Sequence, residues 1–222
     1  MIKKIIAHDW RATCLSYKLA YFLYLPIVFS VGLIMSQMFV LPFSVWMALS
    51  YSLNPFFVEA KGELNSLYMT LPVKRSQIVV ARYLFSLIML VIGVAAGLAI
   101  MPVARYFSTS RWYLGISGNI AMVAVSVLVF SVLSLFMLPP LFKLGYHKGK
   151  IISLYITPFV FAAISVAYFI FMVISEYNTT LDFIVFASEN MLLVTGGIMA
   201  VSALILWLSY RLSMRFYLRR DF

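Results

Sequence analysis

The sequence has little charge. Only 11% of its 222 residues are charged, whereas 64% are hydrophobic, and the mean hydropathy is +1.01. A chain of this composition could not stay soluble as a monomer in water. The scarcity of charge therefore indicates a membrane protein before any motif is considered.

Residues that commonly carry chemistry are also scarce. Cys14 is the one cysteine, so no internal disulfide can form, and His8 and His147 are too few and too separated for a zinc peptidase. Gly145-Tyr-His-Lys-Gly-Lys150 resembles a phosphate-binding loop, but it is too short between its glycines and has no Ser or Thr after the lysine. We interpret it as a flexible basic loop. We therefore expect no metal site, no nucleotide-binding site and no enzymatic activity in this chain.

Long uncharged stretches take up most of the remaining sequence. A helix needs about 20 apolar residues to cross the hydrocarbon core of a bilayer. The first uncharged run is long enough for two such helices, folded back at Gln37 to Pro42. The sequence therefore predicts an all-α membrane protein with six transmembrane helices. Their expected ranges are 19–36, 39–58, 82–102, 119–141, 151–175 and 189–210.

The basic residues favour one orientation of these helices. Lys and Arg near helix ends are retained on the cytoplasmic side. With both termini inside, all but two of the 17 Lys and Arg residues are cytoplasmic, and only Arg105 and Arg111 are outside. The net charge of +10 is then a topology signal. Because the basic residues are divided among four inner segments, we expect a multi-pass plasma-membrane protein without a nucleic-acid partner.

No predicted span has an ionisable residue in its interior. Ion- and proton-coupled transporters usually hold such a residue deep in a helix. Arg82 and Glu189 come nearest, and we interpret both as edge residues. A channel is also disfavoured, because the sequence has no filter-like repeat. If the protein transports a substrate, the energy would have to come from another polypeptide.

The first 18 residues form a separate unit. Ile5, Ile6 and Trp10 fall near one helical face, while Asp9 lies elsewhere. This pattern predicts a helix over 1–18 that lies flat at the inner membrane interface. Simple N-terminal anchoring is the alternative.

The polar connection 59–82 is the longest that the sequence offers to a soluble partner. Its central residues form an apolar stripe, too short to span a bilayer but suited to docking in a groove. Pro72 then breaks the helix. The stripe consists of Leu64, Leu67, Tyr68 and Leu71.

Gly93 and Gly97 are four residues apart in the third predicted span. This spacing allows two helix backbones to approach closely. The glycines could form a dimer seam or internal packing, and we favour internal packing.

A resemblance to a known family rests on this layout and on the 59–83 segment. The segment reads Glu59-x-Lys61, Leu67, Leu71-Pro72-Val73-x-Arg75, Ile78-Val79 and Arg82-Tyr83. With six spans, an interfacial start and a basic tail, the chain resembles the permease subunit of bacterial ABC-2-type exporters. Lys74 departs from the pattern, because Ser or Thr is commoner there. The small size is similar to that of permease subunits of phenol-soluble-modulin exporters.

The resemblance implies an ABC-2 (type V exporter) permease fold over 19–222, with a cytoplasmic coupling segment at 59–81. It implies cytosolic ABC ATPase subunits that bind ATP and Mg, and a second permease copy or a sister permease. Lys74, Arg75 and Arg82 would contact lipid headgroups or acidic partner residues. The residues that would contact the ATPase are Glu63, Leu64, Leu67, Tyr68, Leu71 and Pro72.

The substrate is less closely defined. The chain is 17% aromatic and has 13 methionines, and such a soft apolar wall suits amphipathic cargo better than sugars or ions. Through the resemblance, an amphipathic cytolytic or antimicrobial peptide is the first expectation, and a lipid or hydrophobic drug is the second. A six-span immunity or assembly protein without transport activity is an alternative of another class. Co-purification of an ATPase would distinguish that class from the exporter.

Overall fold

A computed structural model describes residues 3, 5–7, 9–11, 24, 26–30, 37–61, 75–107, 116–176 and 190–219. Within these ranges the chain is helical apart from single turn residues, so the all-α prediction is confirmed for the described part. The principal helices are α3 (Gln37–Ser52), α4 (Asn54–Lys61), α6 (Arg75–Phe107), α7 (Ile116–Glu176) and α9 (Met191–Leu218).

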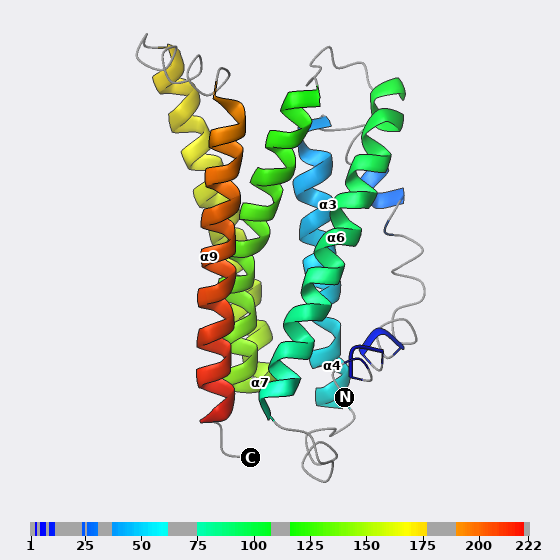
Figure 1. Cartoon of the computed structure of the whole chain (residues 1–222), viewed down its shortest axis with the longest axis vertical. Coiled ribbons are helices and arrows are strands. Elements are labelled where there is room, and N and C mark those ends of the chain that lie inside the picture. The colour runs from blue at the N-terminus through cyan, green and yellow to red at the C-terminus, as the bar shows by residue number, and fades with distance from the viewer. Residues whose placement is uncertain are drawn as a thin grey trace.

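Helix α7 consists of two antiparallel arms that meet at Gly145. Gly145 has φ 75° and ψ 177°, a backbone conformation that a residue with a Cβ rarely adopts. A Cβ on Gly149 would lie 2.9 Å from Leu141 Cα, so the second arm starts against the end of the first. Figure 1 shows the reversal at the lower end of the bundle. The flexible loop expected at 145–150 is therefore wrong, because these residues form a tight helical reversal.

A proline ends α3 and starts α4. Pro55 lacks an N–H and cannot continue the hydrogen-bond ladder of α3, so the chain turns at Leu53 and resumes as α4 at Asn54. Leu53 N donates to Ser50 O over 3.3 Å, and Phe56 N donates to Leu53 O over 3.1 Å. Helix α3 itself starts at Gln37 and contains Pro42. The fold-back expected at Gln37 to Pro42 is therefore wrong, because this stretch is helical.

Helices α3 and α6 pack tightly because glycines remove side chains between them. A Cβ built on Gly93 would lie 2.7 Å from Ala48 Cβ, and one on Gly97 would lie 3.3 Å from Leu41 Cα. Ser44 Oγ donates to Gly93 O over 2.7 Å, which fixes the crossing point. The face of α6 that carries both glycines thus lies against α3 of the same chain, the internal alternative weighed above.

The described helices are apolar over membrane-spanning lengths. Three of them, at Arg75–Val103, Asn119–Tyr146 and Met191–Leu218, are long and apolar enough to cross a bilayer. The count of six spans stays a prediction. Only 6% of the residues in the most apolar stretch of α9 are buried inside the protein, so one side of this helix can face lipid or another chain.

Candidate functional site

A buried ionic cluster lies where three segments of the chain meet. Arg82, in the second turn of α6, exposes only 2% of its surface. Its Nη2 donates a hydrogen bond to Glu59 Oε2 over 3.2 Å, and its Nε forms an ion pair with Asp9 Oδ2 at 3.3 Å. The side chains of Asp9 and Glu59 are 3% and 11% exposed. We call Asp9, Glu59 and Arg82 the ionic cluster.

The three members of the cluster come from three separate segments of the chain. Glu59 lies near the end of α4, and Arg82 follows the start of α6 by two turns, so the two ends of the intervening segment are brought together. Asp9 comes from the helical residues 9–11 near the N-terminus. Three separate stretches of chain are therefore held by one guanidinium group. This group suits the role because its rigid fork presents several donors at fixed angles.

Aromatic rings pack against one side of the cluster, starting with Phe56. The Arg82 guanidinium carbon lies 4.7 Å from the centre of the Phe56 ring, a cation–π distance. Phe56 meets Phe142 edge to face at 4.9 Å between ring centres, and Phe142 meets Tyr217 in the same way at 5.5 Å. These rings belong to a buried core that joins α4, α6, α7 and α9. A charge enclosed in this way needs its partners, since an unpaired buried ion is very costly.

The N-terminal residues pack on the same region. Ile5 is 8% exposed, Ile6 packs against Phe85 and its neighbours, and Trp10 meets the Phe85 ring edge to face at 6.3 Å. Figure 1 shows this segment in dark blue beside α4. The sequence placed Asp9 away from the apolar face, but Asp9 is buried against Arg82.

A second contact joins α6 to α9. The Tyr83 hydroxyl lies 2.7 Å from both Ser209 Oγ and Ser213 Oγ. Ser209 Oγ also donates to Ser134 O of α7 over 3.1 Å. Sequence reasoning missed this contact, because Tyr83 and the two serines are far apart along the chain. No sequence signal identifies it, because the burial of these serines on α9 is seen only in the structure.

The candidate site residues fall into three groups. Glu63, Leu64, Leu67, Tyr68, Leu71, Pro72 and Lys74 lie outside the described residues. Arg75 is exposed at the start of α6, where a headgroup contact stays a prediction. Arg82 is a correction: its charge is satisfied inside the chain by two carboxylates, so it is not placed to contact headgroups or a partner. Both Glu59 and Arg82 stood in the quoted motif, but the sequence did not indicate that they pair.

The geometry of the ionic cluster suits the transmission of movement between segments of the chain. The ionic cluster joins segments and places no nucleophile or general base on a substrate-sized cavity. It can transmit a displacement of one segment to the other two, since a buried salt bridge resists separation of its members.

Comparison with known proteins identifies the family. The model of a family described as "ABC-2 family transporter protein" matches residues 4–218. No curated protein and no solved structure matched the sequence. The matched range includes all the helices described above and the whole ionic cluster. Members of this family are the membrane permease subunits of ABC transporters, which work with an ABC ATPase and generally lack a nucleotide-binding site of their own. The chain therefore belongs to the ABC-2 transporter family, as a membrane-embedded permease subunit.

Proposed function

We propose that this permease is one half of an exporter in the bacterial plasma membrane, with six spans and both termini in the cytoplasm. Its cargo is an amphipathic peptide of the cytolytic or antimicrobial kind. A second copy or a sister permease completes the path. Separate cytosolic ATPase subunits bind ATP and Mg and supply the energy. The orientation is supported by the distribution of Lys and Arg, and the cargo by the resemblance and by the aromatic and methionine content.

The ionic cluster is the observation that supports coupling most directly. The proposed coupling helix, Glu63 to Leu71, lies between Glu59 and Arg82 in the chain. These two residues are bonded to each other, and Asp9 joins them. A push on this helix by an ATPase would therefore be carried into α4, α6 and the N-terminal residues together. A loop that merely linked two spans would not need a buried ion pair between its two ends.

Substitutions in the proposed coupling helix test this function. Leu67→Asp or Leu71→Asp should bury an unpaired carboxylate in the contact with the ATPase, which costs several kcal/mol of binding. Both residues lie outside the predicted spans, so insertion should be normal. The expected result is a permease at normal abundance that no longer co-purifies with its ATPase or no longer exports.

Asn65→Asp is the matched control, because it adds the same charge to the predicted helix outside the apolar stripe. It should have little effect on ATPase binding. If both leucine variants keep the ATPase and export substrate, the segment is an ordinary solvated loop. A wild-type chain that purifies without any ATPase and is functional alone would favour the immunity or assembly alternative instead.

A further inference from the structure

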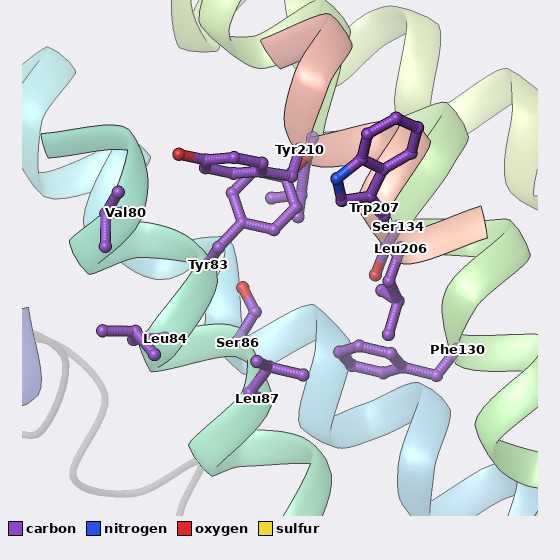
Figure 2. Close-up of a pocket in the computed structure, with 11 residues that line it drawn as sticks. Val80, Tyr83, Leu84, Ser86, Leu87, Phe130, Ser134, Leu206, Trp207 and Tyr210 are labelled. Carbon is purple, nitrogen blue, oxygen red and sulfur yellow. The ribbon is translucent and has the colours of Figure 1, made fainter. Parts of the chain in front are cut away.

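An apolar groove lies between α6 on one side and α7 and α9 on the other. Its volume is about 310 Å³. Figure 2 shows Leu87 of α6 facing Phe130 of α7, with Leu206 and Trp207 of α9 on the same side of the space; Leu84 of α6 also lines the groove. The hydroxyl of Ser86, which also lines the groove, donates to Arg82 O over 3.0 Å, so it is engaged with its own helix. The walls are therefore almost entirely hydrocarbon.

The groove has a basic rim at one end. Tyr83 and Tyr210 meet edge to face, with 5.5 Å between ring centres, at the end nearest the start of α6. Just past them, the Arg211 guanidinium carbon lies 5.0 Å from the centre of the Trp207 ring. Trp207, Arg211 and Arg215 are spaced at i, i+4 and i+8, so they form one stripe that leads from the groove to the rim.

The rim lacks acidic neighbours on the helices that form it. Neither α6 nor α9 contains an Asp or Glu, and α7 has only Glu176, at its far end. Lys143, exposed on α7, adds a further positive charge at the same end, with Nζ 5.1 Å from the centre of the Phe216 ring. Positive charge at the mouth of an apolar groove complements an amphiphile that has an anionic head. Trp and Tyr at that mouth are typical of the membrane interface.

The volume of the groove limits which amphiphiles can bind in it. A volume near 310 Å³ is at the lower end of the range of ligand pockets, roughly 300–1,000 Å³. A helical peptide is about 10–12 Å across with its side chains. At that width, a volume near 310 Å³ would hold only about two of its residues. A single hydrocarbon chain is a better match.

We propose that this groove binds one acyl chain of an anionic phospholipid, whose headgroup is held by Arg211 at the rim. The lipid comes from the leaflet at the end of the bundle where α9 terminates. Its tail would lie between α6 and α9, on the side of the Tyr83 contact that faces the middle of the membrane. The inference needs only the membrane embedding of the chain, and it holds whatever the transported substrate is.

Photo-cross-linking tests this site. The purified full-length protein is reconstituted in vesicles that contain phosphatidylglycerol with a diazirine on one acyl chain, and the labelled residues are mapped by mass spectrometry. We expect labels concentrated on the groove residues of α6 and α9. Unlabelled phosphatidylglycerol should compete for this site more strongly than phosphatidylcholine.

Two pairs of variants make the test specific. Leu87→Trp should fill the groove and reduce labelling there severalfold, whereas Ile88→Trp, next to it and equally exposed (40% against 39%), should not. Leu84→Trp repeats the test from a second position, should Leu87→Trp fold poorly. Arg211→Gln should reduce the preference for the anionic lipid about fivefold, the contribution of one basic residue near such a surface, whereas Arg219→Gln, about two helical turns further from the groove, should have a clearly smaller effect.

Several results would overturn the proposal. One is labelling spread evenly along the exposed faces of α6 and α9. Another is labelling that both groove-filling variants leave intact. Equal competition by the two lipids, or displacement by a peptide but not by lipid, would also contradict an anionic phospholipid as the occupant.

Discussion

Replacing Arg82 by Leu should destabilise the protein strongly. The change removes the one charge shown to pair with both Asp9 and Glu59, while leaving both carboxylates in an enclosed aromatic surrounding. Removing one partner of a buried ion pair typically costs about 3–5 kcal/mol. The lower value already corresponds to more than about a hundredfold change in the unfolding equilibrium. The leucine side chain cannot offset this by apolar contact alone, because the two carboxylates stay buried.

Substitutions of Asp9 and Glu59 show how much of this loss of stability comes from each ion pair. Asp9→Asn and Glu59→Gln each remove one of the two carboxylates shown to pair with Arg82, so each should cost less, about 1–3 kcal/mol. Combining both with Arg82→Leu also neutralises the two carboxylates that lose this partner. The triple variant should therefore recover much of the stability that Arg82→Leu alone loses. Arg82→Lys should be intermediate, because an ammonium lacks the rigid fork that reaches two carboxylates.

Unfolding of the purified protein in detergent, by heat and by denaturant titration, measures these differences. Arg75→Leu is the control, since it removes the same charge from the same helix at an exposed position, and it should change stability by no more than about 0.5 kcal/mol. If Arg82→Leu is no more costly than Arg75→Leu, or if the triple variant is the least stable of all, the cluster does not hold the three segments together.

Three further predictions concern packing and topology. Tyr83→Phe should cost about 1–2 kcal/mol by leaving the Ser209 and Ser213 hydroxyls without their shared partner, whereas Tyr210→Phe, which keeps the ring contact, should be mild; equal effects in thermal unfolding would contradict the hydrogen bonds. Gly93→Val should cost about 1–3 kcal/mol through collision with α3, while Gly196→Val, with nothing within 4 Å of its Cβ position, should be tolerated, as gel filtration and melting would record. In a Cys14→Ser background, an impermeant thiol reagent on intact cells should label Ser108→Cys and Asn178→Cys but not Ser66→Cys; labelling at Ser66→Cys would reverse the proposed orientation.

The helices could be predicted from the sequence because membrane burial imposes a simple local rule. An uncharged run of sufficient length must satisfy its backbone polar groups internally, which helix formation achieves. The runs around α6, α7 and α9 were therefore found in the right places. Helix ends were less accurate: α6 starts at Arg75 and α9 continues to Leu218, because a helix can extend past the hydrocarbon core wherever it still packs on its neighbours.

The ionic cluster could not be predicted because it depends on tertiary contacts. Lone Asp9, Glu59 and Arg82 each look like residues that face water or headgroups. The packing of the N-terminal residues on Phe85, and of α4 against α7, encloses them. The same holds for Tyr83, whose partners on α9 are not identifiable from spacing. The proposed coupling residues Glu63 to Leu71 lie outside the described residues, so their role rests on the sequence pattern.

The position of the Tyr83 contact also determines how far the ends of the helices can move. Tyr83 attaches α6 to α9 close to the start of α6, and from there the helix continues to Phe107, a length of roughly 36 Å at about 1.5 Å per residue. A rotation of about 5° around this attachment would displace the far end of α6 by roughly 3 Å. Helix α3 would travel with it, since Gly93 and Gly97 leave no slack between the two. An angular change too small to break the hydrogen bonds of Tyr83 would thus be enlarged at the opposite membrane surface.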